Sequence, residues 1–243
     1  MRTFRSEGPV SYEKYRFGYC EWLEREAGDP LEPIYAAGYL PFSASHGDTL
    51  DHFYMARSLR VRLSDFRIRK DRRYDHRQWE AHGLQRHCTS REAFMKACGE
   101  VAQPLAQKWM EARFGEAYLD AQRLERILTG PPLSEVLYWK KAKRLVAFAL
   151  LVRENVLAHY WYIFYENGPG ERTPPGHGYL IDFLSWARQN NLQQAYLGTA
   201  YGLKSRYKSR GLSGIEFWDG NRWDDDRVRL HRLQEADASR AAT

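Results

Sequence analysis

His159-Tyr-Trp-Tyr-Ile-Phe-Tyr165 is a seven-residue run of aromatic and β-branched side chains. This composition predicts a strand that is covered on both faces. A loop follows from Glu166 to Gly178, with three prolines and four glycines. The segment from Tyr179 to Asn190 has the spacing of an amphipathic helix, since apolar residues recur at positions 180, 183, 184 and 187. The sequence therefore predicts a strand, a glycine-containing loop and a helix in succession.

A second strand is predicted at Gln194–Gly198, followed by a basic and aromatic loop at Tyr201–Arg210. A glycine loop before a helix brings free backbone N–H groups to the helix N-terminus, where an anion binds favourably. We expect this loop and the cationic loop after residue 200 to converge on one cleft that holds an anion.

The composition is that of a globular protein. The chain has 243 residues, of which 43% are hydrophobic and 14% aromatic. No stretch reaches the roughly 18 apolar residues that a membrane helix needs, so no membrane partner is expected. The first residues lack a signal-peptide pattern, and the three cysteines have no repeated spacing. We therefore predict a cytoplasmic protein with no metal and no bound cofactor.

The net charge of +6 is concentrated in one segment. Nine Arg or Lys and three Asp lie between Arg57 and Arg77, a surplus as large as that of the whole chain. A smaller cluster lies in the loop at Tyr201–Arg210. Such clusters favour a polyanion, RNA above all, whereas the alternative is a solvated basic face without a partner.

The remaining elements are less sharply marked. Strict alternation at Leu59–Leu63 predicts a strand with a wet, arginine-lined face. Thr89-Ser-Arg-Glu92 matches a capping box, so a helix is expected from Thr89 to about Leu128, interrupted at Pro104 and near Gly115. A strand at Leu145–Val152 would turn at residues 153–155 into the aromatic strand, and the tail from Asp224 is mildly helical. We predict an N-terminal region at 1–133 and a second domain at 134–243.

Several kinds of chemistry have little support. Ser205 and Lys208 fit a Ser-x-x-Lys pattern, but its companion motifs are missing. No Walker loop or Gly-x-Gly-x-x-Gly is present. Thr173-Pro-Pro-Gly-His-Gly178 resembles in its place, though not in its letters, the pyrophosphate-binding loop of acyl-CoA N-acyltransferases. The alternative is a plain Gly/Pro turn before a helix.

The segment from Tyr160 to Trp223 resembles the C-terminal half of the aminoacyl-tRNA–protein transferases, the arginyltransferases and bacterial leucyltransferases. Their landmarks occur in the same order as Tyr162-Ile-Phe-Tyr-Glu-Asn167, Asp182-Phe-Leu-Ser-Trp-Ala187, Tyr196-Leu-Gly-Thr199, Lys204-Ser-Arg-Tyr-Lys208 and Asp219-Gly-Asn-Arg-Trp223. Leu59-Arg-Val-Arg-Leu-Ser-Asp-Phe66 is similar to an N-terminal strand of the family.

This chain departs from the family pattern at several positions. Phe17-Gly-Tyr-Cys20 lacks the first cysteine of the eukaryotic Cys-Gly-Tyr-Cys motif, which puts a metal role there in doubt. Trp79 replaces the asparagine that closes the basic run, and Glu166-Asn167 replaces Asp-Pro. Ser205 replaces the methionine of Lys-Met-x-Tyr-Lys. Donor or acceptor could therefore differ from those of the known enzymes.

The resemblance implies a mixed sheet flanked by helices, of the GNAT-like acyltransferase type, with a second, degenerate unit of this kind as a further option. It implies transfer of an aminoacyl group from a charged tRNA, the co-substrate, to the α-amine of a protein or peptide N-terminus. The alternatives are an acyl-CoA-dependent N-acyltransferase and a non-catalytic tRNA- or peptide-binding module.

The expected site residues fall into three groups. Those expected at the reacting groups are Tyr207, Lys208 and, as a proton relay, His177. Those expected to bind substrate are Tyr165, Gly176, Gly178, Tyr196, Gly198 and Lys204. Those expected to bind tRNA or an acidic partner are Arg67, Arg69, Lys70, Arg72, Arg73 and Arg77.

Overall fold

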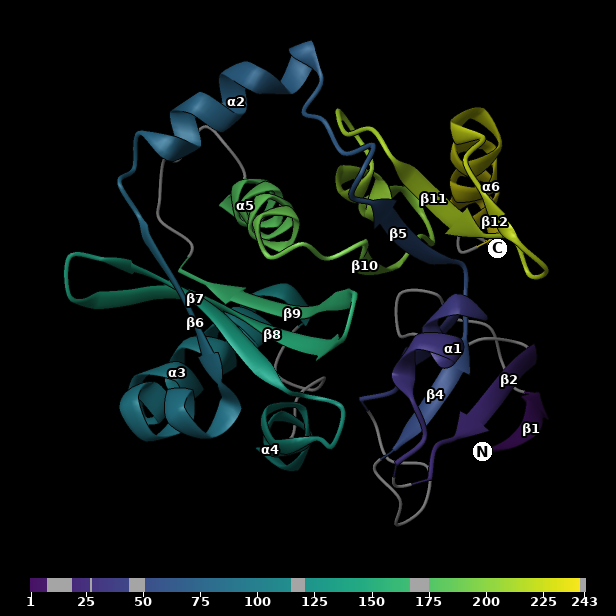
Figure 1. Ribbon diagram of the computed structural model, residues 1–243, viewed down its shortest axis with the longest axis horizontal. Coiled ribbons are helices and arrows are strands. Elements are labelled where there is room, and N and C mark those ends of the chain that lie inside the picture. Colours follow the sequence, from purple (N-terminus) through teal and green to yellow (C-terminus); the bar gives the residue numbers. More distant parts are fainter. Residues whose placement is uncertain (8–18, 27, 44–50, 115–120, 167–174, 241–243) are drawn as a thin grey trace.

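The computed structural model describes residues 1–7, 19–26, 28–43, 51–114, 121–166 and 175–240 (Figure 1). Within these ranges the chain forms two sheets. The smaller sheet is antiparallel and has the order β1-β2-β4-β3, with β1 at Arg2–Glu7, β2 at Tyr19–Glu24, β3 at Tyr39–Pro41 and β4 at His52–Met55. Helix α1, Leu31–Ala36, packs against it.

The larger sheet has the order β12-β11-β5-β10-β9-β8-β7-β6. Its strands are β5 Ser58–Arg62, β6 Gln85–Ser90, β7 Glu135–Lys141, β8 Arg144–Glu154, β9 Leu157–Tyr165, β10 Gln194–Thr199, β11 Ile215–Trp218 and β12 Trp223–Asp224. Among the paired strands that the structure describes in this sheet, β9 and β10 are the only parallel pair. The expected mixed sheet with helices packed against it is confirmed.

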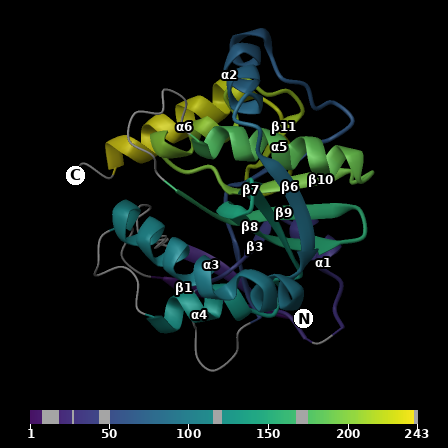
Figure 2. The same cartoon turned by 90° about the vertical axis from the view of Figure 1, so that its left-hand side faces the viewer.

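Helices cover both faces of the larger sheet (Figure 2). One face carries α2 and α5, whereas α3 and α4 cover the other, which also packs on α1 and the smaller sheet. The helices are α2 Lys70–Glu80, α3 Arg91–Phe114, α4 Ala121–Thr129, α5 Pro175–Gln189 and α6 Arg227–Arg240, with a 3-10 helix η3 at Leu203–Lys208. No described helix is long and apolar enough to cross a membrane.

Strand β8 lies deep in the sheet because its residues from Leu145 to Val152 are apolar on both faces and all buried. It turns at Asn155, which has a φ of 44°, into β9. The predicted strands at 145–152, 159–165 and 194–198 and the helical tail are therefore confirmed. Strand β5 is also confirmed, but it lies between β10 and β11 in the interior of the sheet.

Two boundary predictions are wrong. The side chain of Ser90, not that of Thr89, accepts the hydrogen bond from the Ala93 N–H, and α3 begins directly after Ser90, at Arg91. Helix α3 continues through Pro104. The larger sheet takes β5 and β6 from before residue 133 and its other strands from after it. The division into two domains at this residue stays a prediction. A second, degenerate acyltransferase unit stays a prediction.

Candidate active site between strands β9 and β10

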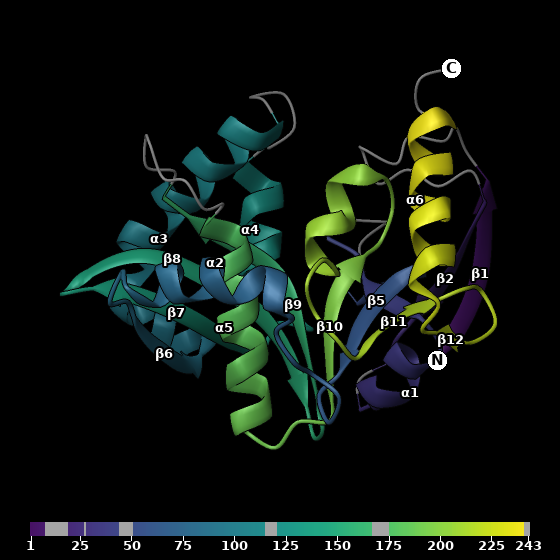
Figure 3. The same cartoon turned by 90° about the horizontal axis from the view of Figure 1, so that it is seen from above.

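Strands β9 and β10 are paired over a short stretch and then part. Their parallel register runs only from Leu157–Gln194 to His159–Tyr196. The register of β10 with β5 also shifts between Tyr196 and Thr199, where Gly198 has a φ of 79°. Beyond this bulge the two strands diverge, and η3 follows directly after β10 (Figure 3). The divergence leaves backbone groups and side chains of both strands facing a common space.

Lys208, the last residue of η3, reaches back to this point of divergence. Its Nζ donates a hydrogen bond to the Thr199 carbonyl oxygen at 2.9 Å. A Cβ atom built on Gly198 would lie 3.4 Å from Nζ and 3.8 Å from Nε2 of His159. The two nitrogens therefore approach the same small space, which is left open because residue 198 has no side chain.

The electrostatics of this space favour a reactive ammonium group. Burial and the nearby positive charge of Arg113 lower the pKa of Lys208 to about 8. Arg113 belongs to the last turn of α3 and lies 5.1 Å from the Trp109 ring. A lysine with a pKa near neutrality can stabilise a developing negative charge and can also exchange a proton.

His159 is the residue of this site that the sequence did not single out. It is 2% exposed, its Nδ1 lies 2.9 Å from the Tyr35 hydroxyl, and its Nε2 has no hydrogen-bond partner among the described residues. Burial and the charge of Lys208 lower its pKa to about 3. The imidazole is therefore neutral at pH 7. In the sequence, His159 is recognisable only as a polar residue at the start of an apolar strand. Tyr35 is too distant in sequence for the two residues to be paired in advance.

Several tyrosines pack together on the α5 side of the larger sheet. Burial raises the pKa of Tyr160 and of Tyr207, and each is further influenced by the nearby Tyr165. The Tyr160 hydroxyl is buried without a hydrogen-bond partner among the described residues. Tyr165 lies at the end of β9, edge-on to Trp109 at 5.8 Å. The phenols of Tyr160 and Tyr207 therefore stay protonated and can act as hydrogen-bond donors.

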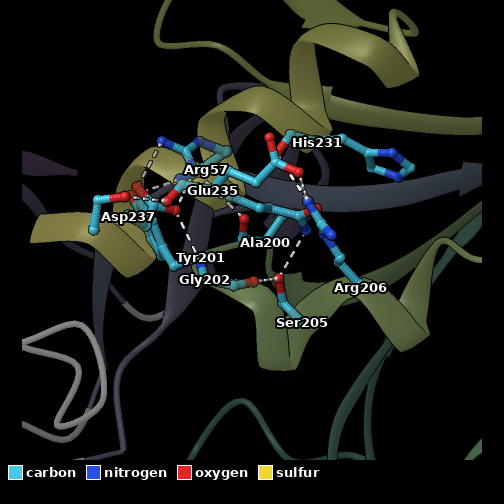
Figure 4. Close-up of polar contacts among 11 residues, drawn as sticks. Arg57, Ala200, Tyr201, Gly202, Ser205, Arg206, His231, Glu235 and Asp237 are labelled. Atoms are coloured by element: carbon cyan, nitrogen blue, oxygen red, sulfur yellow. Dashed lines mark hydrogen bonds and ion pairs between the residues drawn. The ribbon is translucent and has the colours of Figure 1, made fainter. Parts of the chain in front are cut away.

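Segment η3 is held by α6, as Figure 4 shows. The Asp237 carboxylate, 3% exposed, pairs with Arg57 at 2.6 Å and accepts from the Gly202 N–H at 2.9 Å. Arg206 pairs with Glu235 at 2.7 Å. Because Gly202 immediately precedes η3, these contacts fix where η3 begins. They thereby hold the helix that ends at Lys208.

The expected glycine loop is partly helix. Residues 167–174 lie outside the described residues, and α5 begins at Pro175. Gly178 is explained by packing, since a Cβ there would lie 1.9 Å from Cδ1 of Trp79. A phosphate therefore has no room on that face of Gly178. Gly176 lies against Tyr165 instead, and a Cβ there would be 3.0 Å from the tyrosine hydroxyl.

His177 lies in helix α5, whereas the sequence placed it in the loop before that helix. It is 4% exposed in the first turn of α5, and its ring is hydrogen-bonded to the backbone of Arg210. Burial and the charge of Arg72 lower its pKa to about 4. Its role as a proton relay stays a prediction. The bond to Arg210 places the start of α5 beside the end of η3, and the convergence of the two loops on one cleft stays a prediction.

Tyr196, which was expected to bind substrate together with Gly198, is buried. It is 2% exposed and packs 4.7 Å from the Tyr35 ring and 5.7 Å from that of Trp223. Its backbone is paired with β5 on one side and β9 on the other, so it cannot pair with an incoming peptide. Of the two residues expected there, only Gly198 lies at the divergence. Lys204 is exposed on η3.

The basic residues divide into two sets. The arginines of β5 are paired with carboxylates, as Arg60 is with Glu216 at 2.8 Å, so the expected arginine-lined wet face is not a free cationic surface. The expected RNA-binding residues lie in and just before α2: five are exposed, whereas Arg72 is partly buried and paired with Asp75 at 2.6 Å. No described group of three or more His, Cys, Asp or Glu could hold a metal ion.

No family model matches the chain, and no curated protein matches it. Several solved structures do match the chain. One is the C-terminal domain of a protein assigned as a lysylphosphatidylglycerol synthetase from Agrobacterium fabrum, with 17% identity and a TM-score of 0.44, covering 70% of this chain and 51% of that one. FemX has 14% identity and a TM-score of 0.46, with 76% and 65% covered. L-PGS from Bacillus licheniformis has 18% identity and a TM-score of 0.40, with 59% and 44% covered. The chain thus spans about half to two thirds of the length of these structures.

Proposed function

We propose that this protein transfers an aminoacyl group from a charged tRNA to an amine, and that the reaction takes place where β9 and β10 diverge. One observation carries the proposal: the Lys208 ammonium, with a pKa of about 8, is fixed at the Thr199 carbonyl beside the glycine bulge. The resemblance of residues 160–223 to the aminoacyl-tRNA–protein transferases supports the choice of donor. It also supports the α-amine of a protein or peptide as the acceptor.

The chemistry requires little covalent help. The amine nitrogen attacks the ester carbonyl carbon, a C–N bond forms, and the carbonyl electrons move to oxygen. The C–O bond to the ribose then breaks, the ribose oxygen takes a proton and the nitrogen loses one. The ester is already activated, so the protein must orient the reactants and stabilise the oxyanion.

Lys208 fits the second requirement. Its ammonium is directed at the space beside Gly198, where a carbonyl oxygen could accept a hydrogen bond from Nζ. Because the pKa of Lys208 is about 8, the same group can pass a proton to the leaving ribose oxygen and recover one from the attacking amine. Neutral His159 offers a further nitrogen on the same space.

The test is incubation with a mixture of charged tRNAs and a library of peptides with different N-terminal residues, read by mass spectrometry. Added mass on a peptide names both the donated residue and the acceptor. A thermal shift with acetyl-CoA and no transfer from any charged tRNA would instead favour the acyl-CoA-dependent N-acyltransferase. Binding of tRNA without transfer to any acceptor would leave a non-catalytic module.

A further inference from the structure

A surface pocket of about 540 Å³ lies apart from the divergence of β9 and β10, on the outer side of α5. One wall is the segment that leads from β5 into α2, with Phe66, Arg67 and Ile68. The other wall is the C-terminal half of α5, with Arg188 and Gln189, and Arg73 of α2 completes the lining. Figure 1 shows α2 lying over α5 at this place. We call it the α2–α5 pocket.

The three arginines of the α2–α5 pocket have no carboxylate within ion-pair distance among the described residues. Arg67 donates to the backbone oxygens of Ser64 and Phe66. Arg73 and Arg188 reach backbone oxygens of the same segment at 3.5 Å each. Guanidinium groups gathered without a counter-ion attract an anion, and their planar donors match the oxygens of a phosphate.

The shape of the pocket limits the ligand. Its volume lies in the range of sites for small organic ligands and exceeds what a lone phosphate fills. Phe66 and Ile68 add an apolar part, and guanidinium planes offer surfaces for a stacked base. A phosphate joined to a nucleoside satisfies both parts, whereas a free anion satisfies only the first.

We propose that the α2–α5 pocket binds one nucleotide unit of an RNA strand, its phosphate on Arg73 and Arg188. The identification of that RNA as the donor tRNA rests on the proposed function. Helix α5 connects the two places: His177 lies beside η3, and Arg188 follows about 16 Å further along the helix at 1.5 Å per residue. A tRNA whose ester lies between β9 and β10 would thus place an inner nucleotide in the pocket.

The experiment measures binding of uncharged tRNA by fluorescence anisotropy over a range of salt concentrations. In R73A/R188A we expect the Kd to rise about tenfold or more, and the slope of log K against log salt to fall by about one per lost phosphate contact. Gln189→Glu adds a negative charge to the lining without changing its shape, and its Oε1 still accepts from Arg86, so folding is kept while tRNA binding weakens. Arg232→Ala, an exposed arginine on α6, is the control and keeps the wild-type slope.

Adenosine monophosphate serves as a second probe. It should raise the melting temperature of the wild type and of Arg232→Ala, but not that of R73A/R188A. Unchanged tRNA affinity and salt slope in both R73A/R188A and Gln189→Glu would overturn the proposal, as would an equal shift by the nucleotide in R73A/R188A. Neither probe requires transfer. Pocket-dependent binding without any transfer would therefore count against the proposed function alone.

Discussion

The Lys208 ammonium lies 2.9 Å from the carbonyl oxygen of Thr199, so η3 folds back onto the end of the strand that precedes it. Removing the ammonium tests the site most directly. We expect Lys208→Ala to keep its fold and to lose transfer at least about tenfold, since an oxyanion donor is removed. Lys96→Ala is the control, because Lys96 is exposed near the N-terminus of α3, whereas Arg113 lies at the C-terminus of this helix. Undiminished transfer in Lys208→Ala would remove this residue from the site.

The pH dependence of transfer should be bell-shaped. An α-amine acceptor with a pKa of about 7.7–8.0 becomes reactive as pH rises, because only the neutral amine attacks. The Lys208 ammonium is lost as pH rises through about 8, so the rate then falls. Lys208→Arg keeps its charge at high pH, and its alkaline limb should disappear even though its rate is lower. An identical alkaline limb in both proteins would show that Lys208 does not control it.

Gly198 and Gly202 offer a matched pair of substitutions. Both have a positive φ, of 79° and 62°, so alanine strains the backbone by about 1–3 kcal/mol at either position. A Cβ at Gly198 would also lie 3.4 Å from Nζ of Lys208, whereas at Gly202 it would meet nothing within 4 Å. We therefore expect similar losses in the free energy of unfolding, measured with urea, but a larger loss of transfer for Gly198→Ala.

Asp237 should contribute strongly to stability. Asp237→Asn leaves the Arg57 guanidinium in a largely buried place without its counter-charge, which costs about 3–5 kcal/mol in comparable cases. Glu235→Gln is the control, because the Glu235 side chain is 62% exposed and its pair with Arg206 should contribute no more than about 1 kcal/mol. Urea denaturation of the two variants measures the difference. Equal effects would mean that the Asp237 contacts do not hold η3.

Acid should destabilise the protein well before its carboxylates are protonated. The pKa values of His159 and His177 are lowered to about 3 and about 4, whereas in the unfolded chain they lie near 6.5. Between these limits the unfolded state binds more protons, so stability falls as pH falls below about 6.5, by up to about 1.4 kcal/mol per pH unit for each histidine.

Urea denaturation at pH 7 and at pH 5 measures this effect. His177→Gln should show a smaller difference between the two pH values than the wild type. His82→Gln, which alters an exposed histidine, should show the wild-type difference. If His177→Gln retains the full difference, burial of this ring does not contribute to the pH dependence.

The local elements of the sheet could be predicted because each is encoded over a short stretch. The apolar run at Leu145–Val152 and the alternation at Leu59–Leu63 identify β8 and β5 without reference to the rest of the chain. The position of β5 could not be predicted in this way. The arginines that alternate along β5 predict a face exposed to solvent. Only the folded chain brings Glu216 to Arg60.

The site shows the same division. Lys208 and Gly198 could be singled out as a charge and a backbone-permissive residue in one short segment. His159 and Arg113 could not, because their roles depend on Tyr35 and on the end of α3, both far away in sequence. The packing at Gly178 could not be predicted, because a glycine at the start of a helix is as compatible with a packed indole as with a phosphate, and Trp79 is about a hundred residues away.

Strand β5 separates β10 from β11, although it is contributed from before residue 63. A shortened chain that begins after β5 would leave both neighbours with a row of unsatisfied backbone donors and acceptors along their inner edges. Such a fragment would be prone to self-association through that gap. Attempts to express the C-terminal half alone should therefore retain everything from Ser58 onward.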